Sequence, residues 1–230
     1  MKKPSVIVFD VNETLSDMSP MAQRFADIGA PEHLAKFWFA SLLRDGFALA
    51  AAGDNGSFPD IGADVLRGMF DEMELNRDSG SAVEHVMGGF SSLSLHPDVV
   101  QGVKALHGAG YRLVTLSNGS THIAEKLFTD AGIRDKFELL LSVEDAPTWK
   151  PSKTAYEYAA SVYGSSPNDM LLTAVHPWDI HSAARAGLST AWINRDEAQY
   201  PQYFQAPDHT VPKLPDLVTA LDKGRLNRGS

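Results

Sequence analysis

The chain has 230 residues, of which 43% are apolar, and its formal net charge is −9 at pH 7. This length suffices for one large domain or for a core with an insertion, and the apolar fraction allows a hydrophobic core to form. The negative charge argues against nucleic acid and anionic membranes as partners. Because the sequence has no cysteine, it excludes disulfides, a thiolate nucleophile and a cysteine-ligated metal site.

The first apolar run is too short for a secretory signal and ends in an aspartate, and no stretch is long enough to span a membrane. We therefore expect a cytoplasmic protein.

Strand-like runs alternate with helix-like segments along most of the chain. The runs that predict strands are residues 5–9, 111–116, 138–142, 170–175 and 190–193. The segments that predict helices between them are residues 98–109, 121–131, 153–163 and 179–186. Strands that alternate with helices favour an α/β fold, with a Rossmann-like parallel sheet joined by right-handed crossovers.

Residues 16–95 break this alternation, because they contain helical stretches at 32–52 and 60–75 and no convincing strand. We expect an all-helical cap here, inserted into a core made of residues 1–15 and 96–230. Four apolar residues at helical spacing are expected to form the core of the cap: Phe37, Trp38, Leu42 and Phe47. The tail after Tyr200 is rich in proline and polar residues and is uninformative about secondary structure.

Asp10 ends the apolar run 6–9, where a buried strand would stop. In an open α/β sheet this position faces a crevice, and a carboxylate there can attack carbon or phosphorus and form a covalent ester. An aspartate in the same place can also simply cap the next turn. From this segment alone the two interpretations are equally open.

Further polar side chains follow other predicted strands. Together with Asp10 they form four sets: Asp10 with Thr14, Ser117 with Asn118, Lys150, and His176 with Asp179. The carboxyl ends of parallel strands meet at one edge of a sheet, so these sets can converge. Each set alone has an ordinary explanation as a turn, a surface lysine or a helix cap. Their joint placement favours a site.

Segments 9–15, 117–119, 150–151 and 178–179 resemble the haloacid dehalogenase (HAD) superfamily, and more closely its L-2-haloacid dehalogenase (type II) branch. The resemblance covers essentially the whole chain and implies a HAD-like core with an inserted cap. It implies that Asp10 is the nucleophile, that Thr14 hydrogen-bonds its carboxylate, and that Lys150 keeps it ionised.

The resemblance also assigns roles around this centre. Ser117 and Asn118 would bind the substrate carboxylate and help to place Lys150. Asp179 would orient Lys150 and the hydrolytic water. We expect Phe39 and Trp178 to contribute to substrate binding.

Two departures from the branch concern its substrate pocket. The branch carries an arginine after the cap tryptophan, whereas Trp38 is followed here by Phe39. Arg44 lies roughly 140° further around a helix, so it is no simple replacement. Asn12 stands where the branch usually has an aromatic residue.

A third departure lies before Trp178, where Ala174 and His176 replace a serine and an asparagine. We expect Glu13 and His176 to meet beside Asp10 and to activate water, in place of the missing serine and asparagine. Histidine is a suitable general base near neutral pH, and a carboxylate partner fixes its tautomer. The competing interpretation is a solvated Glu13 and a structural His176.

The function these residues predict is hydrolytic dehalogenation of small (S)-2-haloalkanoic acids to 2-hydroxy acids, through an ester on Asp10. It needs a small 2-haloacid and water, no cofactor and no metal, and the branch implies a homodimer. The alternative within the superfamily is a Mg²⁺-dependent phosphatase acting on a small phosphate ester. Such phosphatases use a second aspartate as general acid at the position of Asn12. A non-catalytic binding protein with the same fold is a third possibility.

Overall fold

The computed structural model describes residues 4–226. Its centre is a sheet of six parallel strands in the order β3-β2-β1-β4-β5-β6. The strands are β1 (Val6–Phe9), β2 (Arg112–Ser117), β3 (Phe137–Ser142), β4 (Met170–Ala174), β5 (Ser189–Ile193) and β6 (His209–Val211). All four residues of β1 are buried, as expected for a central strand covered on both faces.

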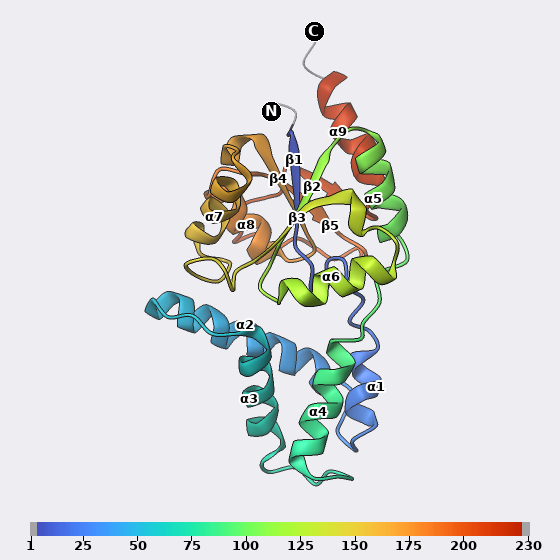
Figure 1. Ribbon diagram of the computed structural model, residues 1–230, viewed down its shortest axis with the longest axis vertical. Coiled ribbons are helices and arrows are strands. Elements are labelled where there is room, and N and C mark those ends of the chain that lie inside the picture. Colours follow the sequence, from blue (N-terminus) through green and yellow to red (C-terminus); the bar gives the residue numbers. More distant parts are fainter. Residues whose placement is uncertain (1–3, 227–230) are drawn as a thin grey trace.

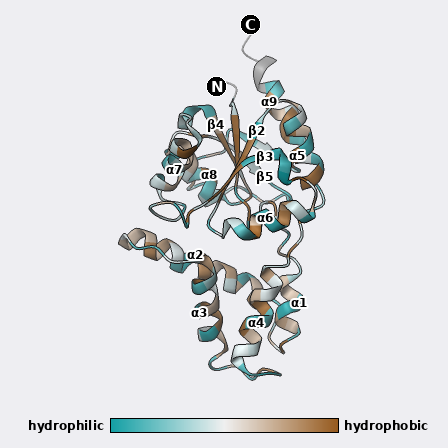
Figure 2. Cartoon of the chain, viewed as in Figure 1, coloured by the Kyte–Doolittle hydropathy of each residue, from teal (hydrophilic) through white to brown (hydrophobic). Residues whose placement is uncertain are grey.

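Helices cover both faces of the sheet (Figure 1). They are α5 (Val99–Gly108), α6 (Thr121–Asp130), α7 (Lys153–Tyr163), α8 (Pro177–Arg185) and α9 (Asp216–Leu226), with short 3₁₀ turns η1 (Arg134–Lys136) and η2 (Pro167–Asp169). Side chains of β1 alternate between two hydrophobic clusters: Val6 and Val8 join one, and Ile7 and Phe9 join the other. The apolar strands form the centre of the core in Figure 2.

Four helices follow β1 before the chain returns to the sheet. They are α1 (Met21–Ala26), α2 (Leu34–Ala52), α3 (Phe58–Phe70) and α4 (Ser79–Phe90). They lie beyond the carboxyl ends of the strands, and α2 runs across the face nearest the core (Figure 1). The segment that enters these helices after β1 and the segment that leaves them after α4 lie side by side. Ser16 and Leu95 join the two segments in an isolated antiparallel bridge.

Local signals explain where the cap helices start. The Ser57 side chain accepts a hydrogen bond from the Asp60 amide at the start of α3, and Asp78 does the same for Ser81 at the start of α4. Each bond satisfies one amide that has no partner inside the helix.

The predicted α/β fold with a Rossmann-like parallel sheet is confirmed, and its five predicted strands lie within one residue of β1 to β5 at each end. The tail after Tyr200, whose secondary structure was left unpredicted, contains β6 and α9. The division at residues 15/16 and 95/96 remains a proposal. No helix among the described residues is long and apolar enough to cross a membrane.

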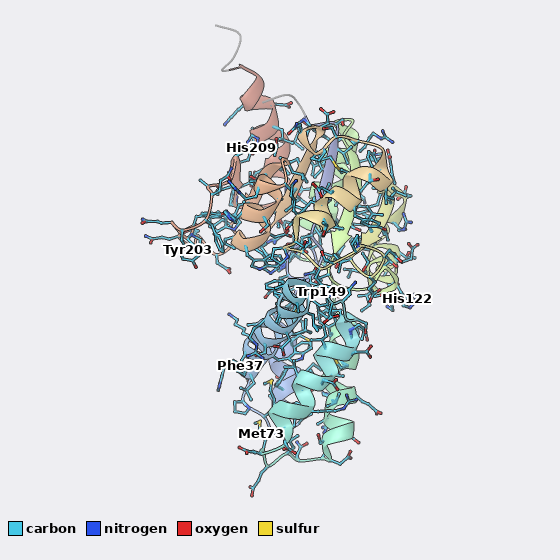
Figure 3. All side chains as sticks on the ribbon, turned by 90° about the vertical axis from the view of Figure 1, so that its left-hand side faces the viewer. Phe37, Met73, His122, Trp149, Tyr203 and His209 are labelled. Atoms are coloured by element: carbon cyan, nitrogen blue, oxygen red, sulfur yellow. The ribbon has the colours of Figure 1, made fainter. Side chains whose placement is uncertain are left out.

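The prediction that Phe37 lies in the core of the cap was wrong. Trp38 and Leu42 are fully buried in it, but Phe37 is 56% exposed and points away from the cap (Figure 3). Adjacent residues of a helix lie about 100° apart, so the orientation of α2 that buries Trp38 and Phe39 turns Phe37 toward solvent.

Candidate active site

Asp10 directly follows β1, the strand between β2 and β4. Its amide donates a hydrogen bond to the Thr173 carbonyl, which continues the pairing with β4 by one residue. Its side chain is only 5% exposed. Residues that follow β2 and β4 therefore flank Asp10, and Asn118 and His176 occupy those places.

Three side chains hold the Asp10 carboxylate. The Thr14 hydroxyl donates to Oδ2 over 2.5 Å, and Lys150 Nζ donates to Oδ1 over 2.9 Å. His176 Nδ1 lies 3.2 Å from Oδ2. The Thr14 hydroxyl also accepts from the Val175 amide, which ties the loop after β1 to the end of β4. Both carboxylate oxygens are thus fixed in place.

Lys150 is fully buried and joins two carboxylates, since its Nζ donates to Asp10 and to Oδ2 of Asp179 over 2.6 Å. The Asn118 side chain makes two hydrogen bonds to the Lys150 backbone. Its oxygen accepts one from the Lys150 amide and its nitrogen donates one to the Lys150 carbonyl, and both are 3.1 Å long. Asn118 therefore holds the Lys150 backbone in place.

Asp179 lies in the first turn of α8, where a carboxylate is favoured by the partial positive charge of a helix start. Pro177 occupies the first helical turn, and His176 before it is extended. This local geometry leaves His176 outside the helix, beside Asp10. Trp178 and Asp179 are carried by the helix itself.

Tyr156 of α7 is a site residue that the sequence did not indicate. Its hydroxyl donates to Oδ1 of Asp179 over 2.5 Å. It lies on the buried face of α7 with Ala155, Ala159 and Ala160. The available signal was a tyrosine on an apolar helix face, because a buried hydroxyl needs a hydrogen-bond partner.

The electrostatics favour an ionised Asp10. Burial acts to raise its pKa, but the Lys150 charge, His176 and the Thr14 hydroxyl together hold the pKa well below its usual range. Burial lowers the pKa of Lys150, and the two carboxylates more than reverse this, so the ammonium stays charged. Burial raises the pKa of Asp179 in spite of Lys150.

His176 also contacts Glu13, whose Oε2 lies 2.8 Å from Nε2. Burial lowers the pKa of His176, but its bonds to Asp10 and Glu13 raise the pKa to about 9. Glu13 has a φ of 59°, a left-handed conformation that is uncommon for a residue other than glycine. The Ser16 hydroxyl accepts from its amide and His96 Nε2 binds its carbonyl, so its backbone is held on both sides.

Aromatic rings cover this centre from the cap and from α8. The His176 ring stacks on Trp178 with centroids 5.1 Å apart, and Phe39 of α2 lies 6.4 Å from His176. Phe47 of α2 meets the edge of Trp178 at 4.9 Å, and Lys150 Nζ lies 5.8 Å from the Trp178 ring centre. Phe39 and Trp178 therefore both reach the site.

A cleft of about 790 Å³ opens between cap and core and is lined in part by Glu13, Phe39 and His176. Lys36 and Arg195 lie on the same cleft. Arg44 is exposed instead and pairs with its neighbour Asp45, so it does not replace an arginine at position 39.

Ser117 is buried at the end of β2, and its hydroxyl accepts from the Gly119 amide. Gly119 packs closely on Asn12, since a Cβ there would lie 2.9 Å from Asn12 Nδ2. The residues expected at the site thus lie around one point, although Ser117 shapes its turn rather than contacting Asp10. Among residues 4–226 no cluster of three or more histidine and acidic side chains is arranged to hold a metal ion.

Trp149, next to Lys150, connects this centre to the cap at the junction of the two parts (Figure 3). Its Nε1 donates to the Gly56 carbonyl over 2.8 Å, and its ring stacks on Phe58. At Gly46 of α2, a Cβ would lie 2.3 Å from the Trp149 ring. The glycine therefore lets α2 approach the residue beside Lys150.

Comparison with known proteins identifies relatives over nearly the whole chain. The haloacid dehalogenase-like hydrolase family matches residues 4–187. Haloacetate dehalogenase H-2 of Moraxella sp. (strain B) is 30% identical over 220 residues, which is 95% of this chain and 98% of that protein.

Solved structures agree with this. An L-2-haloacid dehalogenase is 26% identical with a TM-score of 0.89, covering 96% of this chain and 100% of its own. The L-2-haloacid dehalogenase of Xanthobacter autotrophicus with chloropropionic acid covalently bound is 25% identical with a TM-score of 0.82, covering 98% and 99%. The chain therefore belongs to the haloacid dehalogenase-like hydrolases, in their L-2-haloacid dehalogenase branch.

Proposed function

We propose that this hydrolase cleaves the carbon–halogen bond of small (S)-2-haloalkanoic acids and releases 2-hydroxy acids, through an ester on Asp10. One observation carries the proposal: a buried carboxylate at a strand end is kept ionised by a buried ammonium 2.9 Å away. The relatives named as haloacetate and L-2-haloacid dehalogenases support the substrate class.

In the first step an Asp10 oxygen attacks C2 of the haloacid, and the halide leaves with the electrons of the carbon–halogen bond. Thr14 and Lys150 hold the carboxylate in one orientation for this attack. Attack opposite the leaving halide inverts C2. The covalently bound chloropropionic acid in the Xanthobacter protein supports an intermediate of this kind.

In the second step water attacks the Asp10 carboxyl carbon, and the bond between C2 and its new oxygen stays intact. The charge that develops on the former Oδ1 faces Lys150, a donor already in place. Asp179 holds the Lys150 side chain in this position, and Asn118 holds its backbone. Collapse of the intermediate frees the 2-hydroxy acid and restores Asp10.

Around this chemistry we assign Ser117 and Asn118 to the substrate carboxylate, and Phe39 and Trp178 to the apolar wall beside the haloalkyl group. The first pair lies at the end of β2, the strand beside β1, and α2 and α8 carry the second.

The competing phosphatase has less support. Asn12 cannot donate a proton as the general acid of such phosphatases does. A non-catalytic binding protein is disfavoured by the intact contacts among Asp10, Lys150 and Asp179.

The test is a comparison of substrates. The protein is incubated with each enantiomer of 2-chloropropionate and with p-nitrophenyl phosphate, in EDTA and in Mg²⁺, and halide and phosphate release are measured. We expect chloride from the (S)-enantiomer at equal rates in EDTA and Mg²⁺, and none from Asp10→Asn. Phosphate release that requires Mg²⁺, without chloride release, would favour the phosphatase, and release of neither would favour the binding protein.

We also propose that the protein is a cytoplasmic homodimer, a state suggested by the resemblance and by the frequency of two-fold oligomers. A monomer mass by light scattering at working concentration would overturn the dimer.

A further inference from the structure

His176 lies between two carboxylates, with Nδ1 3.2 Å from Asp10 Oδ2 and Nε2 2.8 Å from Glu13 Oε2. Ionised carboxylates only accept hydrogen bonds, and a neutral imidazole has one N–H to donate. Only the imidazolium can donate to both neighbours at once. The geometry of the free site therefore calls for a protonated His176.

The charges that face this ring come from two segments. Asp10 at the end of β1 and Glu13 in the next loop contact it directly, whereas α2 and α8 present the aromatic rings of Phe39 and Trp178. Lys150 contacts the other Asp10 oxygen, and Asp179 lies beyond Lys150. His96 binds the Glu13 carbonyl rather than its carboxylate. Asp10 therefore supplies one of the two negative charges in contact with His176.

Esterification of Asp10 removes that charge. Burial disfavours the imidazolium, and after ester formation Glu13 is the one carboxylate in contact that still opposes this effect. The pKa of His176, about 9 in the free protein, must therefore fall when the ester forms.

We propose that His176 and Glu13 form a charge-triggered general base: the Asp10 carboxylate holds His176 protonated, and formation of the Asp10 ester releases that proton so that His176 can accept one from the attacking water. This inference rests on the proposed function and assigns the base of its second step.

The protons balance over the cycle. After the halide leaves, His176 loses the Nδ1 proton to solvent in the cleft that it lines, and its Nε2–H stays hydrogen-bonded to Glu13. Neutral His176 then takes a proton from water while the hydroxide oxygen bonds to the Asp10 carboxyl carbon. Collapse expels the alkoxide, which takes the proton of the new Asp10 carboxyl group. Asp10 is again a carboxylate, His176 is again protonated, and one proton has been released for each halide.

The other charged residues at the site are less suited to this role. Lys150 is kept protonated by its two carboxylates. Asp179 is fully buried, and its two oxygens accept from Lys150 and Tyr156. His176 Nδ1, in contrast, faces the Asp10 carboxyl group that water must attack.

Nuclear magnetic resonance tests the trigger without turnover. The imidazole nitrogens are titrated in the wild-type protein and in Asp10→Asn, whose neutral side chain reproduces the charge of the ester. We expect the midpoint of His176 to fall by at least one pH unit in Asp10→Asn, with exposed His122 as the internal reference. Equal His176 midpoints in the two proteins would overturn the trigger.

Rapid-quench kinetics with (S)-2-chloropropionate test the base. In His176→Ala we expect one equivalent of chloride per site, an ester visible in the intact-protein mass, and ester hydrolysis slowed by about 10²–10⁴-fold. Glu13→Gln should retain the burst and change the pH dependence of ester hydrolysis. Unchanged steady-state turnover in His176→Ala would overturn the dyad alone. Absence of chloride release from the wild-type protein would overturn the proposed function itself.

Discussion

Tyr156 and Asp179 share a 2.5 Å hydrogen bond, on the carboxylate oxygen that Lys150 does not contact. Asp179 is therefore fixed by a neutral donor on one side and a charged donor on the other. Through Asp179, the hydroxyl of Tyr156 acts on the position of Lys150, and so on the ammonium that keeps Asp10 ionised.

Replacement of Tyr156 by phenylalanine should lower the free energy of unfolding by about 1.5–3 kcal/mol, the usual effect of losing a hydrogen bond to a charged group. Turnover should fall as well, because Asp179 loses one of its two donors. Urea denaturation and chloride release measure the two effects. Tyr158→Phe, the same change on a partly buried residue of α7, is the control and should have little effect.

Replacement of Lys150 by methionine should raise the pKa of Asp10, because the effect of burial is then opposed only by His176 and the Thr14 hydroxyl. Removing one partner of a buried ion pair typically costs about 3–5 kcal/mol of stability. We expect turnover to fall at every pH, and a spectroscopic titration of the Asp10 carboxyl group to show protonation at a higher pH than in the wild type. Lys153→Met, at an exposed lysine paired with Glu157, is the matched control. An unchanged Asp10 titration in Lys150→Met would contradict the role given to Lys150.

Stability should depend on pH through His176. Its pKa is raised from 6.5 in the unfolded chain to about 9 in the fold. A raised pKa contributes stability that is fully present below pH 6.5 and is lost as the pH rises to about 9. The contribution is roughly 3 kcal/mol for a shift of this size.

The stability difference between the wild type and His176→Asn should accordingly shrink between about pH 6 and pH 9.5. Chemical denaturation at both values measures it, with His122→Asn at an exposed position as the control. A difference that grows with pH would show that His176 is neutral in the folded protein.

Replacement of Gly46 by alanine should disrupt the junction of cap and core, since the new Cβ would lie 2.3 Å from the Trp149 ring. Overpacking of this kind typically costs about 1–3 kcal/mol. Turnover should fall too, because Trp149 precedes Lys150. Gly68→Ala on α3 is the matched control: a Cβ there meets no atom within 4 Å, and alanine favours a helix over glycine by up to about 1 kcal/mol. Equal effects at the two positions would contradict the importance of this junction.

The sequence predicted the parts of this protein that depend on regular patterns. Continuous apolar runs marked β1 and β4 because both faces of a central strand are buried. The edge strand β6 has three residues of mixed burial, so no periodicity revealed it. Polar residues at strand ends indicated the site, since parallel strands bring their carboxyl ends together.

Other contacts depend on tertiary geometry. Nothing in the sequence near Tyr156 indicates that α7 turns its hydroxyl toward Asp179, on a different helix. The meeting of Glu13 and His176 was predicted from the adjacency of β1 and β4, and the two side chains do lie 2.8 Å apart. The left-handed backbone of Glu13 was not foreseen, because glycine is the residue that usually signals this conformation.

The covalent ester on Asp10 is the centre of this account, and isotope labelling tests it most directly. A single turnover is run with excess protein, (S)-2-chloropropionate and ¹⁸O-labelled water, and the label is located by mass spectrometry of the peptide that contains Asp10 and of the product acid. If Asp10 is the nucleophile, the label enters its carboxyl group, and the first lactate released carries unlabelled oxygen from the protein. Label in that first lactate, with none in Asp10, would show that water attacks C2 directly and would contradict the account.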